Sequence, residues 1–433
     1  MDVKVAKWSP GESSPVVSAF LERAAFDSDA QAAAVRVLQD IRENGAKAVT
    51  AYVKEFDGAA LTPDQLRVPT AELGGARSKV DSDFRNAARE VHKRIMAFAA
   101  AGMKKNWETF SARGGTVGEQ FEPFDRVGAY IPGGAAPLVS TVLMTVTLAK
   151  VAGVTEIVAC TPPNADGAIN PYLLYALELA GATEVYRVGG IQAIGLMAYG
   201  IKGVPKVQKI VGPGGAYVTA AKRLVYGDVA LDLVAGPSEI AILADVTAVP
   251  AHVAADLLSQ AEHGTGLEKA MLVTNSNELI REVQKELSSQ RESLSRKDAI
   301  RKVMEKGMLL VLVNTLDDGM ELCNRFAPEH LEIMVREPRK WLRKVRCAGA
   351  VFIGAWTPEA VGDFAAGPSH VLPTGGTAAK FSGLTVDDFR RRTSFVAYTR
   401  ADLQDALPLI EAFGRVEGLD AHARSAAIRF KQS

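Results

Sequence analysis

The stretch DLLSQAEHGTG, residues 256–266, places Gln260 and His263 three positions apart at the end of an Ala- and Leu-rich segment. On an α-helix, side chains at that spacing lie on the same face, where they could hold a metal ion or a substrate. The same spacing is equally compatible with the polar face of an ordinary amphipathic helix. The pair alone therefore leaves both interpretations open.

Three further stretches carry ionisable side chains in polar or Gly/Pro-marked surroundings. FAPEHLEIMV contains Glu329 and His330, AVGDFAAGPSHVLPTGG contains Asp363 and His370, and RVEGLDAHARSAAIRF contains Glu417 and His422. Loops with such groups are more often functional than core elements are. Each residue taken singly also has a structural explanation, such as an Asx turn, a strand-end charge or a solvated helix face.

Gln, Asp and His side chains together supply oxygen and imidazole ligands without a thiolate. Such a set suits a divalent ion such as zinc or manganese and can leave positions open for a substrate. The three cysteines, Cys160, Cys323 and Cys347, form no C-x-x-C element, so no thiolate zinc site competes. Their odd number and scattered positions also argue against a disulfide framework.

The elements that must position these groups alternate between strands and helices from Arg126 onward. RVGAYIPGG, EIVACTPP, EVYRVGG and KIVGPGG are expected strands with helical segments between them, and KAMLVTN, MLLVLVN, HLEIMV and GAVFIG continue the series. Such alternation predicts right-handed βαβ units and parallel sheets.

We therefore predict an α/β protein with two Rossmann-like parallel-sheet domains and a small helical C-terminal tail. The first domain is expected to combine 1–126, including a helical N-terminal region, with 237–382; the second is expected over 127–236, and the tail over 383–433. No G-x-G-x-x-G fingerprint and no P-loop stands between a strand and a helix. The turns YIPGGAAP and VGPGGAYV could bring backbone amides close to a phosphate, although tight turns favour glycine anyway.

Composition excludes several classes of partner. The 50 basic and 50 acidic residues cancel, so the chain has no electrostatic footprint for nucleic acid or an anionic membrane. No apolar run is long enough to span a bilayer, and MDVKVAKWSP does not resemble a signal peptide. We expect a cytoplasmic enzyme with a small-molecule substrate.

Nine stretches together resemble the histidinol dehydrogenase family and occur in that family's order. They are RVGAYIPGG, APLVSTVLMT, VPKVQKIVGPGGAYVTAAKR, AGPSEI, DLLSQAEHG, FAPEHLE, SHVLPTGGTA, LTVDDF and EGLDAH. The resemblance extends from about Asp125 to the end, whereas the first hundred residues agree only in helical character.

The resemblance implies a role for each candidate residue. Zinc ligands are implied at Gln260, His263, Asp363 and His422, with manganese as an alternative ion. Substrate contacts are implied at these four residues and at Ser238, His330, His370 and Glu417, and the acid/base pair at Glu329 and His330. Cofactor contacts are implied at Tyr130, Gln192 and Gly215, the last at a position where the family has asparagine.

The implied reaction is oxidation of L-histidinol to L-histidine through the aldehyde, using two NAD and one water. The family's homodimer implies that the tail completes the partner's metal site. Three other interpretations stay open: a family member acting on another polar amino or sulfo alcohol, a metabolite-binding protein without turnover, and a metallohydrolase. The Glu329–His330 pair argues against the binding protein, and the Gly-rich turns favour the dehydrogenase.

Overall fold

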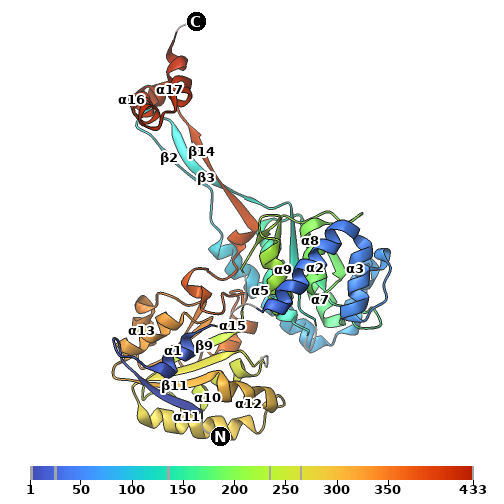
Figure 1. Ribbon diagram of the computed structural model, residues 1–433, viewed down its shortest axis with the longest axis vertical. Coiled ribbons are helices and arrows are strands. Elements are labelled where there is room, and N and C mark those ends of the chain that lie inside the picture. Colours follow the sequence, from blue (N-terminus) through green and yellow to red (C-terminus); the bar gives the residue numbers. More distant parts are fainter. Residues whose placement is uncertain (1–2, 24–26, 134–136, 234–235, 264–265, 432–433) are drawn as a thin grey trace. The chain divides into compact units, whose positions relative to one another are not determined.

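The computed structural model describes residues 3–23, 27–133, 137–233, 236–263 and 266–431. It is an α/β structure with two parallel sheets and one small antiparallel sheet (Figure 1). The expected fold class, with two parallel sheets and a helical C-terminal end, is confirmed. The chain divides into two compact units: Met1–Gly102 with Phe124–Phe389, and Met103–Pro123 with Arg390–Ser433.

The larger sheet of the first unit has six parallel strands in the order β1-β11-β10-β9-β12-β13. Their bounds are β1 Lys4–Trp8, β9 Glu239–Ala244, β10 Lys269–Thr274, β11 Met308–Val313, β12 His330–Met334 and β13 Ala350–Ile353. One face packs on helices α10 (Pro250–Ala261), α11 (Asn277–Arg291) and α12 (Lys297–Lys306), and the other on α1 (Pro15–Leu21) and α13 (Leu316–Phe326). Because both faces are covered, runs such as MLLVLV are apolar throughout and do not alternate.

The second sheet has five parallel strands in the order β6-β5-β4-β7-β8. Their bounds are β4 Arg126–Tyr130, β5 Glu156–Thr161, β6 Glu184–Arg187, β7 Lys209–Val211 and β8 Ala230–Leu231. The strand order reverses between β4 and β7, and crevices at such switch points are where α/β sheets bind ligands. Helices α8 (Gly190–Tyr199) and α9 (Ala216–Leu224) cover one face, while α6 (Val139–Ala152) contacts β4 and β5.

The N-terminal helices pack differently from the expected grouping. Helix α2 (Ser28–Asn44) contacts α8 and α9, and its buried residues share one core with strands of the five-stranded sheet. Helix α5 (Ser82–Gly102) contacts α6, which itself contacts β4 and β5 of the five-stranded sheet. Among the described residues of this region, β1, α1 and Val3 join the six-stranded sheet and the cores on its two faces. Apolar helix faces reveal burial but not the sheet that buries them, so the sequence did not determine this assignment.

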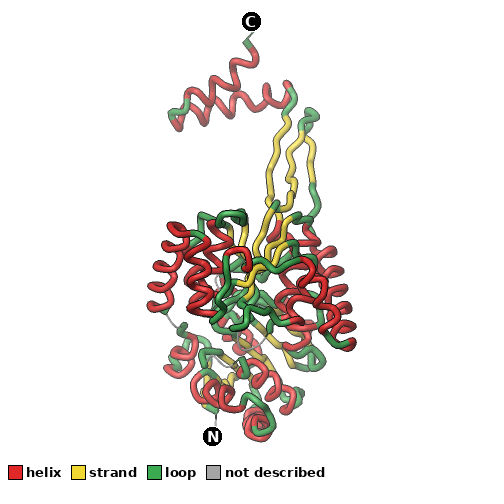
Figure 2. Tube along the Cα trace, turned by 90° about the vertical axis from the view of Figure 1, so that its right-hand side faces the viewer, coloured by secondary structure: helices red, strands yellow, loops and turns green. Residues whose placement is uncertain are grey.

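The second unit is built from a three-stranded antiparallel sheet and two helices, drawn as yellow strands and red helices in Figure 2. Strand β3 (Thr116–Pro123) pairs with β2 (Trp107–Phe110) and with β14 (Arg390–Ala397). Helices α16 (Arg400–Glu417) and α17 (Asp420–Ala427) follow. The expected helical tail over 383–433 thus includes the strand β14. This strand pairs with β3, whose residues were expected in the first domain.

Within the described ranges, no helix combines the length and the apolar composition that a bilayer crossing requires.

A buried arginine ties together the strands at one end of the five-stranded sheet. Arg126 on β4 is 2.8 and 3.0 Å from the two carboxylate oxygens of Glu184 on β6, and 2.7 Å from Glu156 on β5. The hydrogen bonds from Arg126 lower the pKa of Glu184 to about 2. The Glu184 side chain is 16% exposed and that of Glu156 is 54% exposed, so the two ion pairs differ in solvent screening.

We expect Glu184→Gln to lower the free energy of unfolding at pH 7 by about 1.5–3 kcal/mol, the scale of a hydrogen bond to a charged group. Because the folded pKa is depressed, this stabilisation is complete above the ordinary glutamate pKa of 4.5 and is lost as pH falls toward about 2. Urea unfolding at pH 7, 5 and 3 should show that the difference in unfolding free energy between the variant and wild type becomes smaller as the pH falls. Glu156→Gln is the matched control, with an expected loss of at most about 1 kcal/mol. Equal losses in both variants would contradict this explanation.

Candidate active site

The predicted catalytic residues lie at the amino end of the six-stranded sheet. His330 is the first residue of β12, opposite Ile240 of β9, and Glu329 precedes it. Helix α10 ends nearby and supplies Gln260, while the short helix α15 (Glu359–Phe364) supplies Asp363 from its last turn. The structure therefore brings together Gln260, Glu329, His330 and Asp363 from three elements.

Gln260 and His263 do not both lie on the helix. Helix α10 ends at Ala261, so His263 occupies the turn that follows. Gln260 is fully buried, because Leu257, Leu258 and Ala261 beside it pack into the core beneath the sheet. His263 is exposed. The spacing predicted one helical face for both side chains, whereas the structure places Gln260 on the helix and His263 in the turn.

His330 is held so that its two ring nitrogens have different surroundings. Its Nδ1 faces two oxygen atoms, Gln260 Oε1 and Glu359 Oε1, each at 3.3 Å. Its Nε2 lies 3.8 Å from Asp363 Oδ1 and finds no hydrogen-bond partner in the described part of the chain. Burial lowers the pKa of His330 to about 3, so the ring is neutral here. A neutral imidazole with one free nitrogen can accept a proton.

Glu329 is buried beside this ring, with its Oε2 3.9 Å from His330 Nδ1. The backbone N–H of Glu239 donates to the same oxygen at 3.1 Å, and the Ser238 hydroxyl also hydrogen-bonds the carboxylate. Burial raises the pKa of Glu329 well above its usual value. A carboxyl group with a raised pKa is suited to general acid/base catalysis. Ser238, an expected substrate contact, thus lies beside the acid/base pair.

Side chains that fit a divalent metal ion gather next to His330. Ligand atoms of His263, Glu359 and Asp363 all lie within 4.8 Å of one another. Burial raises the pKa of Asp363 to about 6, and that of Glu359 well above its usual value. The amide Nε2 of buried Gln260 has no hydrogen-bond partner among the described residues. Buried carboxylates are costly unless something compensates their charge, and a divalent ion with oxygen and imidazole ligands does so.

His370 connects this site to the other sheet. Its Nε2 is 3.0 Å from Oγ1 of Thr141, a fully buried residue of α6, and its ring also hydrogen-bonds the Asp363 backbone. Burial lowers the pKa of His370 to about 4. The neighbouring Ser369 donates to the Met144 carbonyl at 3.2 Å, so the whole loop is fixed to α6.

Two of the predicted site residues belong to the second unit. Glu417 is the last residue of α16 and His422 lies on α17, and both side chains are exposed. Neither belongs to the group of metal-ligating atoms found among the described residues of the first unit. Their expected roles stay predictions.

The expected cofactor contacts lie at the switch point of the five-stranded sheet. Tyr130 ends β4, and its hydroxyl accepts from the Gly190 N–H, at the start of α8, at 3.3 Å. Gln192 is fully buried; its Nε2 donates to Asp57 at 3.2 Å, and its Oε1 has no partner within the described ranges. Part of the turn before α6, residues 134–136, lies outside the described residues.

Two glycines of the turn before α9 have different structural roles. Gly212 has φ +113°, and a Cβ there would stand 2.2 Å from the Tyr130 carbonyl oxygen, so the close approach requires glycine. Gly215, the N-cap of α9, has φ −69°, and no described heavy atom lies within 4 Å of where its Cβ would stand. The structure would therefore accommodate the asparagine that the family has at position 215.

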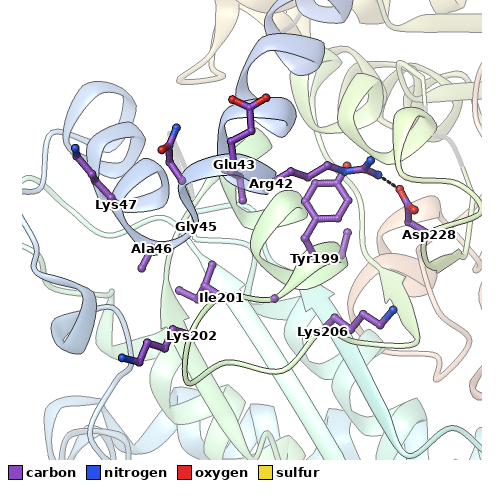
Figure 3. A pocket seen from close by; sticks show the side chains of 14 residues that line it. Arg42, Glu43, Gly45, Ala46, Lys47, Tyr199, Ile201, Lys202, Lys206 and Asp228 are labelled. Carbon is purple, nitrogen blue, oxygen red and sulfur yellow. Dashed lines mark hydrogen bonds and ion pairs between the residues drawn. The ribbon is translucent and has the colours of Figure 1, made fainter.

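A pocket of about 690 Å³ lies between the α2–α3 junction and the end of α8, where α3 is Ala46–Tyr52. Figure 3 shows side chains that line it. An Arg42–Asp228 ion pair and the side chains of Tyr199, Lys202 and Lys206 line it. None of the predicted site residues does so, and Gln192 lies near the opposite end of α8. This pocket is therefore separate from the candidate active site.

Sequence reasoning missed Glu359, Asp57 and Thr141. Glu359 was detectable, because Glu359 and Asp363 stand four positions apart and hence on one face of a helix. Asp57 and Thr141 gave no such signal, because each contacts its partner through the tertiary fold: Gln192 is 135 positions from Asp57, and His370 is 229 from Thr141.

Comparison with known proteins places the chain among well-described relatives. The sequence model of a family described as histidinol dehydrogenase matches residues 21–430. A histidinol dehydrogenase from Heliobacterium mobile is 45% identical over 94% of this chain and 95% of its own length. One from Bacillus anthracis is 43% identical over 91% of each chain. A crystal structure of histidinol dehydrogenase from Elizabethkingia anophelis superposes with a TM-score of 0.94 at 34% identity, covering 99% of this chain and 98% of the other.

Proposed function

This chain belongs to the histidinol dehydrogenase family, and we propose that it oxidises L-histidinol to L-histidine through the aldehyde, with zinc and NAD as cofactors. The first oxidation converts the alcohol to the aldehyde with transfer of one hydride and release of one proton. Water then adds to the aldehyde, and the hydrate loses a second hydride and two further protons to give the carboxylate. Two NAD are reduced for each histidinol.

The observation that carries this proposal is that His330 lies beside the Glu329 carboxylate and next to the grouped metal-ligating atoms described above. With Nδ1 facing Gln260 and Glu359, the free Nε2 can take the hydroxyl proton of the substrate. Glu329, on the Nδ1 side, activates water for addition to the aldehyde. Bound zinc would orient the substrate's amine and imidazole without changing oxidation state, and bound NAD would accept the hydride.

The proposed metal ligands are Gln260, His263, Asp363 and His422, and manganese is an alternative ion. Asp363 supports this because its carboxylate is held in a buried setting that an ion would compensate, and Gln260 because its buried amide lies beside His330. Proposed cofactor contacts are Tyr130, Gln192 and Gly215. They are supported by their place at the switch point of a parallel sheet and by the unpaired Gln192 oxygen.

We further propose a homodimer in which His422 and Glu417 of one chain complete the site of the other. Helix α16 supports this, because it exposes Leu409, Phe413 and Val416 by 65%, 66% and 81%. These positions follow a helical spacing of four and three residues, so they form one apolar stripe. An exposed apolar stripe of this kind is typical of a protein–protein interface.

The direct test is to incubate the metal-loaded protein with L-histidinol and NAD and to follow NADH. Two NADH should form for each histidinol consumed, and mass spectrometry should identify histidine as the product. Oxidation of another amino or sulfo alcohol in preference to histidinol would replace the proposed substrate. Absence of NADH formation with any such alcohol would refute the dehydrogenase activity itself.

The shared site has its own test, in which His422→Ala chains are mixed with His330→Asn chains after each is shown to be inactive. A heterodimer contains one intact site, so random exchange should restore about a quarter of wild-type activity. A mixture of His330→Asn and Glu329→Gln chains is the control, because both substitutions damage the same half-site and should not complement. If exchange is complete and activity does not return, His422 does not act on the partner's site.

A further inference from the structure

Glu359 is the acidic neighbour of the ring that the proposed reaction uses as its base. Its Oε1 is 3.3 Å from His330 Nδ1, while Nε2 on the opposite side of the ring has no hydrogen-bond partner within the described chain. Both side chains are almost fully buried, at 2–3% exposure. Nothing in the reaction as proposed above assigns a role to this carboxylate.

Three elements hold the Glu359 carboxylate in place. Residue 359 begins α15, directly after Pro358, and its backbone N–H donates to Glu332 Oε1 of β12 at 2.8 Å. The carboxyl group of Asp256 on α10 lies near Glu332 and raises its pKa together with burial, and both of these residues are buried. Ser259 of α10 donates to Glu359 Oε2 at 3.4 Å. The carboxylate is therefore fixed by its own helix, by the strand that carries His330 and by the helix that carries Gln260.

We propose that Glu359 is a positioning residue that accepts the Nδ1–H of His330, fixes the ring tautomer and directs the Nε2 lone pair toward the substrate. Carboxylate–histidine pairs of this kind fix ring orientation and stabilise the imidazolium that forms when the ring takes a proton. The inference rests on the proposed function for the identity of the reaction. The tautomer of His330 does not depend on that function.

The competing acceptor for this proton is Gln260 Oε1, which is also 3.3 Å from Nδ1 and is the hydrogen-bond partner of this nitrogen in the structure, whereas Glu359 Oε1 lies at ion-pair distance. Glu359 is the stronger acceptor in its ionised form, because hydrogen bonds to an ionised acceptor are about twice as strong as neutral ones, and a bound cation would favour that form against the burial that raises its pKa. Gln260 is also the proposed metal ligand, and an amide oxygen directed at an ion is not available to the ring. Glu359 itself lies near His263 and Asp363, so direct metal ligation by Glu359 is the alternative that the experiment must separate.

The first measurement does not depend on activity. In metal-loaded protein with ¹⁵N-labelled histidine, long-range proton–nitrogen spectra distinguish a protonated Nδ1 from a protonated Nε2. The His330 signals among the six histidines are identified by their loss in His330→Asn. We expect His330 to be protonated at Nδ1 in wild type, and Glu359→Leu to shift it toward a mixture or toward Nε2. A wild-type ring protonated at Nε2 would overturn the proposal.

The second measurement separates orientation from metal binding. Glu359→Leu should lower kcat for alcohol oxidation by about 10- to 100-fold with little change in the KM for histidinol, the usual scale for loss of such a supporting carboxylate. Glu359→Gln retains an acceptor and should lose less. Both variants should keep their metal by elemental analysis. Glu305→Leu, the same exchange at an exposed glutamate of α12 outside the site, is the matched control and should stay within about threefold of wild type.

Loss of bound metal in Glu359→Gln would assign the residue to the ion and overturn the positioning role. An unchanged kcat in both Glu359 variants would do the same. If wild type does not oxidise histidinol, the proposed function fails, yet the tautomer measurement still tests the His330–Glu359 pair.

Discussion

His330→Asn is expected to slow oxidation of histidinol to the aldehyde by about 10²–10⁴-fold, the usual contribution of a general base. Asparagine keeps a polar side chain of similar reach but cannot take a proton at the position of Nε2. That nitrogen finds no partner in the described part of the chain, so its replacement breaks no hydrogen bond there. Because the ring also loses its Nδ1 contact with Gln260, an unchanged melting temperature of the variant would assign the loss to the chemistry and not to the fold. Single-turnover measurements starting from the alcohol and from the aldehyde would locate the slowed step.

Glu329→Gln should give the complementary result. Glutamine preserves the shape and can still accept from the Glu239 N–H, but it cannot activate water. Oxidation of added aldehyde should slow by about 10²–10⁴-fold, with alcohol oxidation affected less. His92→Asn is the control for His330→Asn, because it makes the same exchange of residue type on α5, outside the site. If both site variants oxidise alcohol and aldehyde at the wild-type rate, Glu329 and His330 are structural residues.

Removal of the metal ion is expected to abolish turnover, and zinc or manganese should restore it. The purified protein should contain about one ion per chain, as a single four-ligand site requires. His263→Asn and Asp363→Asn should each reduce the metal content measured by elemental analysis, because each removes one atom of the grouped ligand set. Glu262→Gln is the matched control: Glu262 is an exposed carboxylate next to His263 that lies outside the group. Full activity in a verified metal-free preparation would rule out a catalytic ion.

The sequence predicted those parts of the structure that depend on local pattern. Apolar runs such as KAMLVT and MLLVLV predicted buried parallel strands, because such runs are long enough for strands and too short for buried helices. The glycine at position 212 of the Gly-rich turn is explained physically, because only glycine lets the backbone there approach the Tyr130 carbonyl oxygen. The family resemblance supplied the roles of the polar residues, which spacing alone had left open.

The parts that the sequence did not predict depend on contacts between distant segments. The apolar face of α2 indicated burial, but its packing on α8 and α9 and not on the first sheet depends on the folded chain. Strand β14, RRRTSFVA, carries three arginines and resembles a solvated segment; it becomes a strand because β3 offers eight paired positions. The contact between Glu359 and His330 could not be predicted from the sequence, because it depends on β12 placing His330 beside α15.

The pairing of β3 with β14 also has a consequence for how the chain is made. Phe121 and Arg390, which hydrogen-bond in the finished sheet, are 269 positions apart in sequence. At about 5–20 residues per second, a ribosome needs on the order of ten seconds to a minute to cover that distance. During this interval the β2–β3 hairpin has emerged with one edge unpaired, and an unpaired edge is a template for association with another chain. Premature termination before Arg390 should therefore give aggregation-prone chains, whereas complete synthesis covers the edge with the last strand that the ribosome releases.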